Sequence, residues 1–402
     1  MPRLLFLAHR IPFPPDKGEK IRAFHILKHL ARRFEVECGC LVDDPADEAH
    51  IATLCRQVAH LEAQRITGPG RMMQALVQLR PGRPLTHGWF REPRLLRWVA
   101  HGLGSGRYDA VFVSSSGMAP YVMGQPRHPA RQRRVLDLID VDSEKFAAYA
   151  ATGSLPMRLV HGREARTLLG LERRAAAAFD HTLLVSAAEA ARLAALAPEI
   201  AGRIGHLENG VDFARFDPGK PWPSPYTAPG QKIVFTGAMG YPPNIEAVTW
   251  FAQQVLPRLR QRSPPPEFVI VGQNPAPSVR ALEALPGVRV TGTVAEVQPW
   301  LAHAAVAVAP LTLARGIQNK VLEAMAMARP VVATTEAFQG VHATPGRDLL
   351  VADGADAFAA AVAAVLDGRH QGIGVAARAA VLAGHDWAAT LAPLDRLLAI
   401  DG

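Results

Sequence analysis

Cysteine is scarce in this sequence. Three cysteines, Cys38, Cys40 and Cys55, occur among 402 residues, and they are confined to the N-terminal part of the chain. A metal site would need further ligands clustered at a useful spacing, and the sequence offers none. We therefore expect reduced core thiols, with Cys38 and Cys40 inside a predicted strand, and no bound metal.

Long hydrophobic runs are absent as well. No apolar run reaches the length of about 18 residues that a transmembrane helix needs. The N-terminus, MPRLLFLAHRIPFPPDKGEK, has a short apolar run followed directly by charges and prolines. It lacks the long apolar core and the small-residue cleavage site of a signal peptide, so it predicts a first buried strand. We expect a cytoplasmic protein.

Acidic residues are outnumbered by basic ones. Lys plus Arg total 44 and Asp plus Glu total 36, which gives a net charge of +8. This balance favours anionic partners such as nucleotide phosphates, nucleic acid or an acidic membrane surface. No basic stripe interleaved with aromatics and no nucleic-acid motif is present, which argues against nucleic acid. The densest basic run, RHPARQRR (127–134), is either a solvated loop or a contact with anionic lipid.

Short β-rich runs alternate with amphipathic helical stretches along the whole chain. The first series of predicted strands is 3–9, 35–42, 109–115, 134–139, 181–186 and 204–209. The second series is 232–237, 267–272, 288–293, 305–310 and 330–334, with helices near 244–262, 295–302, 318–328 and 355–367. This alternation predicts an α/β protein with two doubly wound parallel sheets. The Pro-rich passage 216–231 is interpreted as a linker between the two halves.

The last predicted helix, within 385–400, has a single apolar stripe. Trp387, Leu391, Leu394, Leu397 and Leu398 fall on one helical face. Such a face must pack on another element, so the helix either caps the second half or crosses back to the first.

Three strands of the second half end in glycine. These are Gly237 after KIVFT, Gly272 after EFVIV and Gly292 in VRVTGT. Ligands of parallel sheets bind at the carboxyl ends of strands, where a glycine lets them approach the backbone closely. Turn chemistry would explain any one of these glycines, but together they favour a ligand cleft.

The segment PLTLARGIQNKVLEAMAMARPVVAT (310–334) sets charges at the start of a helix between two apolar strands. A helix N-terminus has free amide donors and a partial positive charge, which favour phosphate. Arg315 and Gly316 precede the helix, Lys320 lies in its first turn, and Glu323 shares the face of Lys320. The spacing fits a diphosphate held by Arg315, Lys320 and the amides, with Glu323 bonded to a ribose hydroxyl. The alternative is a surface ion pair between Lys320 and Glu323.

These motifs resemble those of the family 4 glycosyltransferases, which are retaining GT-B enzymes that use nucleotide sugars. NKVLEAMAMARPVVAT (319–334) resembles the donor-site segment, and HLENGVDFARFDP (206–218) the domain crossover. VFTGAMGYPPNIEAVTWF (234–251) is similar to the first strand, glycine turn and helix of the donor domain. FDHTLLVSAAEA (179–190) is similar to the last strand and helix of the acceptor domain.

Two N-terminal segments narrow the resemblance. RIPFPPDKGEKIRAFHILKHL (10–30) and DLIDVDSEKF (137–146) look like the sugar transferases associated with PEP-CTERM/exosortase exopolysaccharide loci. The resemblance implies two Rossmann-like doubly wound domains that face a central cleft, with the C-terminal helix crossing back to the first domain. It assigns 1–210, with helix 385–402, to the acceptor-side domain and 211–384 to the nucleotide-sugar donor domain.

The resemblance also implies site residues. The implied catalytic residues are Arg315, Lys320, Glu323, Asp140 and Asp142. The implied donor-binding residues are Gly237, Gly240, Gly272, Gly316, Ile317, Asn319 and Asn209. Gly18, Lys20 and Arg22 form an acceptor-side loop, in which the two cations either meet an anionic substrate or simply begin a helix. No metal is expected, because helix ends and basic side chains stabilise the departing diphosphate.

The sequence departs from the family pattern at three places. Arg315 stands eight positions before Glu323, where relatives have a second glutamate. After the Gly237 turn, relatives have Arg and Lys where this chain has AMGYPPNIEA. Ile139 replaces a family histidine near the transferred sugar. Asp140 or Asp142 then contacts acceptor or sugar, or else the DVDS turn (140–143) simply caps a helix.

With this resemblance we expect a metal-independent hexosyltransferase that uses a UDP- or GDP-sugar, and the resemblance alone implies that the transfer retains the configuration of the sugar. The expected acceptor is a glycan or polyprenyl-linked saccharide of exopolysaccharide biosynthesis, at the inner face of the plasma membrane. Two alternatives remain open: a nucleotide-sugar epimerase on the same fold, and a non-catalytic sugar-nucleotide or glycan-binding protein.

Overall fold

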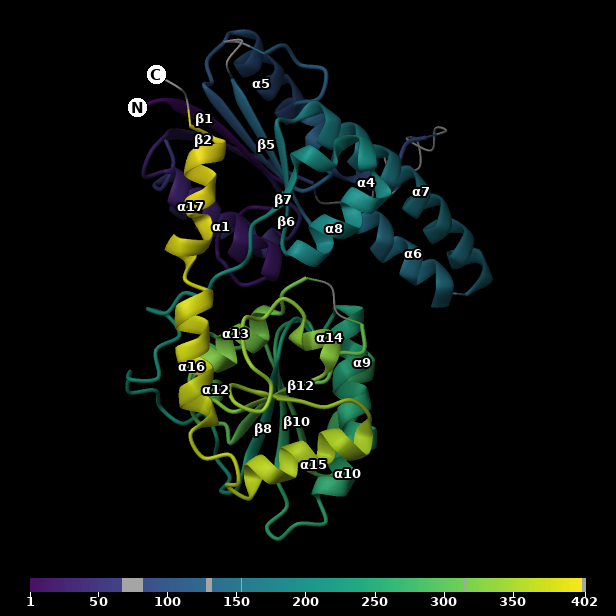
Figure 1. Ribbon diagram of the computed structural model, residues 1–402, viewed down its shortest axis with the longest axis vertical. Helices are drawn as coiled ribbons and strands as arrows, with labels where there is room; N and C mark the ends of the chain where they lie inside the picture. The colour runs from purple at the N-terminus through teal and green to yellow at the C-terminus, as the bar shows by residue number, and fades with distance from the viewer. Residues whose placement is uncertain (67–81, 128–131, 153, 314–315, 400–402) are drawn as a thin grey trace. The chain divides into compact units, whose positions relative to one another are not determined.

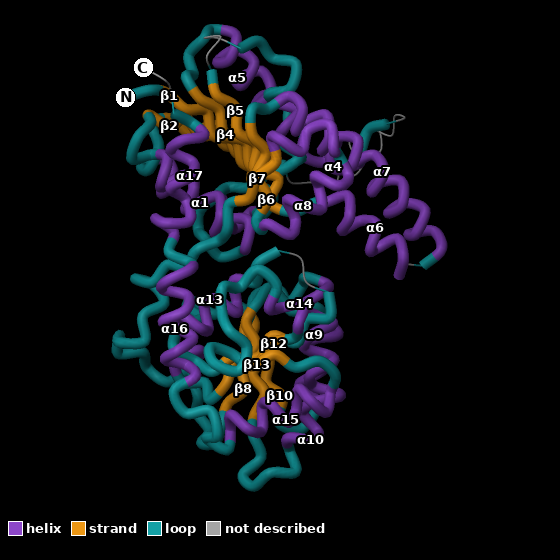
Figure 2. The backbone as a smooth tube through the Cα atoms, in the orientation of Figure 1, coloured by secondary structure: helices purple, strands orange, loops and turns teal. Residues whose placement is uncertain are grey.

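The computed structural model describes residues 1–66, 82–127, 132–152, 154–313 and 316–399. The chain divides into two compact units, Met1–Glu208 with Leu391–Gly402, and Asn209–Thr390. Each unit has a parallel sheet flanked by helices, as Figures 1 and 2 show. The predicted α/β class with two doubly wound sheets is confirmed. None of the helices in the described part of the chain has the length and hydrophobicity that crossing a membrane requires.

The first unit contains a seven-stranded sheet in the order β3-β2-β1-β4-β5-β6-β7. Its strands are β1 (Arg3–Ala8), β2 (Glu35–Val42), β3 (His60–Arg65), β4 (Ala110–Ser114), β5 (Arg133–Ile139), β6 (His181–Leu184) and β7 (Ile204–His206). Leu7, Val113 and Leu136 lie in register on three neighbouring strands and are fully buried. Their alignment helps to form the core of this unit, as expected for a sheet covered on both faces.

The helices of the first unit follow its strands. They are α1 (Gly18–Leu30), α2 (Ile51–Cys55), α4 (Leu85–Phe90), α5 (Pro93–Gly104), α6 (Asp142–Thr152), α7 (Leu155–Ala178) and α8 (Ala187–Leu196), with the 3-10 turns η1 (Pro45–His50), η2 (Ala119–Tyr121) and η3 (Pro198–Arg203). Cys38 and Cys40 are buried free thiols of β2, as predicted, whereas Cys55 is exposed, so the prediction of a core thiol was wrong for this residue.

The C-terminal helix returns to the first unit, as predicted. This helix, α17 (Trp387–Leu397), lies alongside α1 in Figure 1. Asp395 accepts from His29 Nε2 and from Arg33 Nη2, each at 2.9 Å. Leu394 and Leu398 of the predicted stripe are fully buried.

The second unit contains a six-stranded parallel sheet in the order β10-β9-β8-β11-β12-β13. Its strands are β8 (Lys232–Thr236), β9 (Glu267–Val271), β10 (Val288–Gly292), β11 (Val306–Ala309), β12 (Val331–Ala333) and β13 (Leu350–Val351). Ile233 lies between Val306 and Phe268 in register, and all three are fully buried. This unit has its own core.

The helices of the second unit are α9 (Pro242–Trp250), the π-helical turn η4 (Phe251–Val255), α10 (Leu256–Leu259), α11 (Pro277–Arg280), the 3-10 turn η5 (Ala281–Ala284), α12 (Gln298–Ala302), α13 (Asn319–Ala326), α14 (Thr335–Phe338), α15 (Ala355–Leu366) and α16 (Ile373–Gly384). The Pro-rich passage 216–231 lies inside this unit, so its interpretation as a linker was wrong. Its side chains pack there: Tyr226 stacks edge-on against Trp300 and donates to the Trp300 carbonyl at 2.6 Å.

Candidate active site

The turn between β11 and α13 holds several of the predicted donor-site residues. Gly316 has a φ of +63°, in the left-handed region that favours glycine. Ile317 is buried in the core of the second unit, which anchors the turn. Arg315 lies outside the described residues, so its predicted contact with phosphate stays a prediction.

Helix α13 begins at this turn without a side-chain cap. Gln318 occupies the cap position, and its side chain makes no capping hydrogen bond. Its carbonyl accepts from Val321 N at 2.9 Å. The amides of Asn319 and Lys320 have no partner in the described part of the chain, so an anion at the helix start would find two donors there.

Lys320 is partly buried among neutral groups. Its Nζ donates to Asn244 Oδ1 at 2.9 Å and lies 5.0 Å from the centre of the Phe235 ring. Asn244 Nδ2 in turn donates to the Ala238 carbonyl at 2.9 Å, which fixes the amide with its oxygen toward the lysine. Burial lowers the pKa of Lys320 to about 8, and the charge of Glu323 opposes that shift. The ammonium group of Lys320 is therefore fixed in place, and no carboxylate bonded to it neutralises its charge.

Glu323 is the second partly buried charge on this face of α13. Lys320 and Glu323 form no ion pair within 4.0 Å in the described structure, so the alternative of a surface ion pair is not supported. Burial raises the pKa of Glu323 to about 7, against the attraction of Arg215 and then of Lys320. Arg215 was not predicted as a site residue. It comes from the crossover segment 206–218, and its amide bonds to Asp212 Oδ1 at 3.0 Å.

The predicted glycines join the loops after β8 and β9. A Cβ on Gly272 would lie 1.6 Å from the Gly237 carbonyl oxygen, so only glycine fits there. Gly237 N donates to Val271 O at 3.0 Å. A Cβ on Gly240 would lie 3.2 Å from the Asn274 carbonyl, and one on Gly237 would lie 3.4 Å from Lys320 Cε. Gly272 is thus explained by the approach of two loops, whereas Gly237 lies against the lysine.

Asn209 and Asn319 are brought together at the start of α13. Asn209 Nδ2 donates to Asn319 Oδ1 at 3.0 Å. The Asn209 carbonyl lies 3.1 Å from Nδ1 of the buried His385, whose Nε2 accepts from His342 N at 3.1 Å. Because the His342 amide can only donate, Nε2 is unprotonated and Nδ1–H donates to Asn209. His385 therefore positions Asn209, a role that the sequence did not reveal.

The predicted carboxylates of the first unit follow β5. Ile139, at the end of the strand, has a φ of +73°, unusual for a β-branched residue. Asp140 Oδ1 is buried without a hydrogen bond. Burial, then the charges of Asp142 and Glu189, raise the pKa of Asp140 to about 7. Asp142 begins α6 and accepts from Ser116 Oγ at 3.0 Å, and burial raises its pKa as well.

Two further buried carboxylates lie beside this turn and were not predicted. Glu189 accepts from Val141 N at 2.9 Å. Glu172 accepts from Ser143 N at 3.0 Å and from Ser143 Oγ at 2.5 Å, and burial raises its pKa to about 7. The DVDS turn is thus held by glutamates from α8 and α7, and Asp140 is left with an oxygen directed at no protein donor.

The cations of the predicted acceptor-side loop are engaged inside the first unit. Gly18 is the first residue of α1. Lys20 is buried between Asp47 at 2.9 Å and Asp16 at 3.0 Å. Arg22 is fully buried. It makes two 2.8 Å bonds to Asp137 and donates to the Leu207 carbonyl at 2.6 Å. Both side chains thus have structural partners inside the unit and are not the surface charges of the helix-start alternative, and a direct substrate contact stays a prediction.

Metal ligands do not cluster in the part of the chain that the structure describes. No group of three or more His, Cys, Asp or Glu side chains there is placed to hold an ion. The neighbours of Asp140 and Asp142, the two acids of the DVD sequence, are the protein groups given above, such as Ser116 and Glu189.

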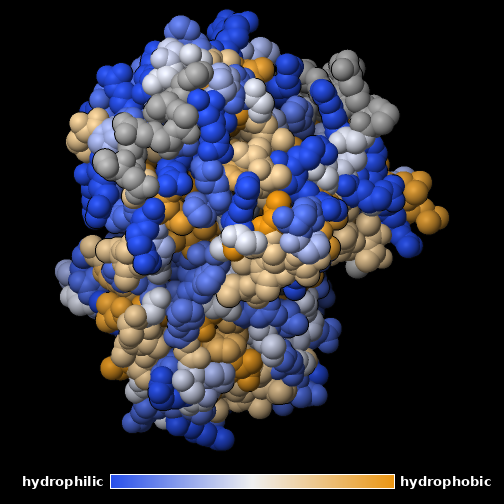
Figure 3. Space-filling view, turned by 45° about the horizontal axis from the view of Figure 1, so that its top comes forward, coloured by the Kyte–Doolittle hydropathy of each residue, from blue (hydrophilic) through white to orange (hydrophobic). Residues whose placement is uncertain are grey.

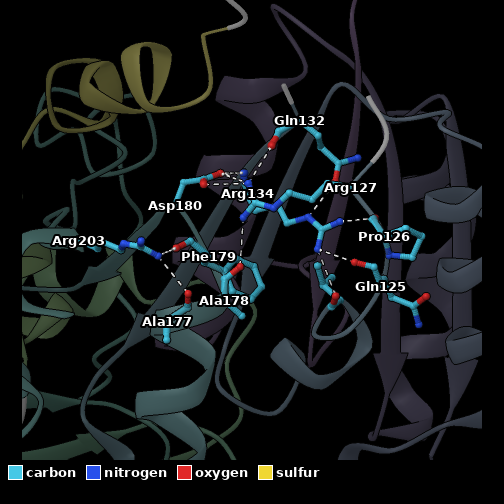
Figure 4. Close-up of polar contacts among 11 residues, drawn as sticks. Gln125, Pro126, Arg127, Gln132, Arg134, Ala177, Ala178, Phe179, Asp180 and Arg203 are labelled. Carbon is cyan, nitrogen blue, oxygen red and sulfur yellow. Dashed lines mark hydrogen bonds and ion pairs between the residues drawn. The ribbon is translucent and has the colours of Figure 1, made fainter. Parts of the chain in front are cut away.

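The described ends of the basic run 127–134 are engaged internally, as Figure 4 shows. Arg127 contacts both Asp180 oxygens at 2.9 and 3.0 Å and donates to the Ala178 carbonyl at the end of α7. Arg134 is buried and bonds to Gln132 Oε1 at 2.8 Å and to nearby carbonyls. Positions 128–131 lie outside the described residues. Arg127 therefore connects the start of β5 to the end of α7, Arg134 connects β5 to the loop at 122–126, and neither is a free surface charge.

Comparisons with known proteins fit this architecture. Residues 230–368 match the family model of "Glycosyl transferases group 1". None of the curated proteins matches the chain significantly. The sucrose-phosphate synthase of Thermosynechococcus elongatus has a TM-score of 0.70 and 17% identity, over 99% of this chain and 98% of its own. Anabaena HepE in complex with UDP-glucose has a TM-score of 0.65 and 16% identity, over 98% and 99%.

A third similar structure is the E. coli trehalose-6-phosphate protein bound with UDP-2-fluoro glucose. It has a TM-score of 0.65 and 13% identity, over 99% of both chains. At these identities the likeness concerns the fold, and it extends over the whole chain. The protein therefore has the GT-B fold, and within its second unit residues 230–368 match the model of the glycosyl transferases group 1.

Proposed function

We propose that this protein is a glycosyltransferase that binds a nucleotide-diphosphate sugar in its second unit. The observation that carries the proposal is Lys320, a partly buried cation held by the neutral Asn244 at the start of α13, where the described residues provide no side-chain cap. Such a place favours a diphosphate, because both the ammonium and the helix start attract negative charge. The family match at 230–368 and the UDP-sugars bound by HepE and the E. coli protein support this assignment.

In the proposed reaction an acceptor hydroxyl attacks the anomeric carbon of the donor sugar. The bond from that carbon to the β-phosphate oxygen breaks, and the hydroxyl proton leaves with the nucleoside diphosphate. Lys320 and the amides of Asn319 and Lys320 stabilise the charge that develops on the departing oxygen. Glu323 accepts a hydrogen bond from a ribose hydroxyl, and Asn209 holds Asn319 at the helix start. The leaving group is thus stabilised by fixed protein charges, and we propose that the reaction needs no metal ion.

The finer assignments follow the family resemblance. The transfer retains the anomeric configuration, and the sugar is a hexose. The acceptor is a glycan or polyprenyl-linked saccharide of exopolysaccharide biosynthesis, handled at the inner face of the plasma membrane. Asp140 is the acceptor-side candidate, because its unbonded, buried Oδ1 is suited to accept from a sugar hydroxyl.

The test begins with ligand-induced shifts in Tm for UDP, GDP and their sugars, because a bound ligand stabilises the folded state. The best donor is then incubated with and without saccharide acceptors, in the presence of EDTA. Acceptor-dependent release of nucleoside diphosphate is expected, together with losses of at least about a hundredfold in Lys320→Ala and Glu323→Ala. Conversion of the donor sugar without acceptor would indicate an epimerase, and binding without turnover a non-catalytic protein. Normal turnover in both variants would refute the site.

A further inference from the structure

The outer end of α7 exposes an unusual group of apolar side chains. Leu155, Met157, Leu159 and Val160 are 76%, 44%, 79% and 41% exposed. They account for four of the ten large hydrophobic residues that are exposed in the described part of the chain, yet they occupy only residues 155–160. Figure 3 shows hydrophobic atoms gathered at the projecting end on the right, next to hydrophilic ones. We call residues 155–160 the α7 tip.

The tip projects because only the later part of α7 packs on the first unit. The helix has 24 residues, which is about 36 Å. Leu168, Leu171 and Ala175 are buried in its second half. Farther out, His161 contacts the rings of Phe146 and Tyr149 on α6, at 5.9 and 5.7 Å between centroids. The α7 tip extends beyond this aromatic contact, which holds the two helices together and so supports the exposed turns.

The exposed charges along α7 are basic. Arg158 lies within the tip, and Arg166 and Arg174 are exposed farther along the helix. The two acids of α7 are both buried and bonded inside the unit: Glu164 accepts from the amides of Leu85 and Thr86, and Glu172 from Ser143. They therefore do not offset the arginines at the surface.

A second group of arginines lies behind the tip, where α4 packs on α7. Burial lowers the pKa of His87 on α4, and the charges of Arg83, Arg91 and Arg174 lower it further. The three arginines thus concentrate positive charge around this histidine. An apolar tip followed by a basic helix surface is complementary to an anionic bilayer, with hydrocarbon beneath a layer of phosphates.

The directions of the four side chains favour a bilayer over a protein groove. At 100° per residue, Leu155 and Leu159 lie on one side of the helix, whereas Met157 and Val160 lie on nearly the opposite side. A groove would cover one side only, but a lipid interface surrounds an inserted helix end. We propose that the α7 tip inserts among the headgroups of an anionic membrane and that the exposed arginines of α7, with Arg83 and Arg91 on either side of α4, bind lipid phosphates. The proposal rests on the proposed function only in that a lipid-linked acceptor requires the enzyme at a bilayer.

The experiment is co-sedimentation of the full chain with vesicles of phosphatidylglycerol or of phosphatidylcholine. The wild type should bind the anionic vesicles, more weakly as salt rises, and the neutral ones at least tenfold less. Leu155→Glu with Leu159→Glu should lower the partition coefficient at least tenfold. Arg158→Gln with Arg166→Gln should lower it several-fold and reduce the salt dependence. The matched control is Val375→Glu with Leu382→Glu on α16, where the side chains are 72% and 45% exposed, and it should bind like the wild type.

Calorimetry with UDP and light scattering complete the test. UDP affinity should be the same in all variants, which shows that they fold and separates this proposal from the proposed function. If the chain binds vesicles but not UDP, the proposed donor site is wrong and the proposed membrane contact of the α7 tip still stands. Absent vesicle binding, or equal binding by the tip variant, would overturn the membrane proposal. So would a wild-type dimer that the tip variant dissociates while neither binds lipid, since a second copy would then cover the tip.

Discussion

Lys320 Nζ donates to Asn244 Oδ1 across 2.9 Å and so connects the first turn of α13 to α9. An amide oxygen fixes the ammonium without neutralising it, unlike the carboxylate of Glu267, which pairs with the buried Lys232 at 2.7 Å in the same unit. Lys232 is neutralised by a carboxylate and Lys320 is not, although both lysines are shielded from solvent. Lys320 is the one that we propose to bind the diphosphate.

The affinity for UDP should depend on pH through Lys320. Burial sets the pKa of this lysine to about 8 in the free protein, and a bound diphosphate raises it. Above about pH 8, binding must take up a proton, so the affinity should fall by up to about tenfold per pH unit. Calorimetry between pH 7 and 9.5 measures this slope. Lys320→Arg should bind with a flatter profile because Arg stays charged, and Lys232→Met should keep the wild-type slope. A wild-type affinity that is flat across this range would exclude the lysine from the diphosphate site.

Arg215 should set the ionisation of Glu323. Burial raises the pKa of Glu323 to about 7, and Arg215 is the strongest group that opposes the rise. In Arg215→Met the carboxyl should stay protonated to higher pH, so the acidic limb of kcat/KM should move up by about one unit. In Arg215→Lys the acidic limb of kcat/KM should lie close to its wild-type pH, because the positive charge is kept. If Arg215→Met lowers activity equally at every pH, the arginine does not act through Glu323.

Much of the fold was predictable because parallel strands buried on both faces are continuous apolar runs. β3, HLEAQR, was missed since it is a half-exposed edge strand in which polar residues alternate with apolar ones. β13 has only two residues, too few to give a pattern. The Pro-rich passage resembles a linker in composition, but its Tyr226 and Trp222 side chains pack against the core of the second unit.

The candidate site was predictable only where its residues share one helix. Lys320 and Glu323 are three positions apart, so their common face follows from helical geometry. The neighbours Asn244 and Arg215 come from α9 and the crossover segment, and their approach depends on how distant loops pack. For the same reason the sequence left the role of Arg22 open, because its partner Asp137 lies 115 positions away.

Asp140→Asn should stabilise the first unit at alkaline pH. The pKa of this carboxyl is about 7 in the folded protein, well above the usual value near 4 of the unfolded chain. Between these values the folded state binds more protons, so its contribution to stability falls as pH rises and is lowest above pH 7. The neutral amide removes that penalty. The free energy of unfolding should rise by about 1 to 4 kcal/mol at pH 8 and stay near wild type at pH 4.5. Urea unfolding at both pH values tests this, and a variant that is less stable at pH 8 would contradict it.

Substitutions in the buried pair of Arg22 and Asp137 should show whether Arg22 stabilises the fold or contacts the substrate. Both side chains are fully buried, and the two 2.8 Å bonds between them satisfy charge and geometry together. Arg22→Met leaves an unpaired carboxylate and an unpaired Leu207 carbonyl, so it should lower the free energy of unfolding by about 3 to 5 kcal/mol. Arg22→Lys should also lose stability, because an ammonium cannot make the bidentate contact. The double variant Arg22→Met with Asp137→Leu should recover a large part of the loss, since no buried charge remains. Unfolding curves of the four proteins measure this. An Arg22→Met variant with normal stability but no turnover would instead place the guanidinium on the substrate.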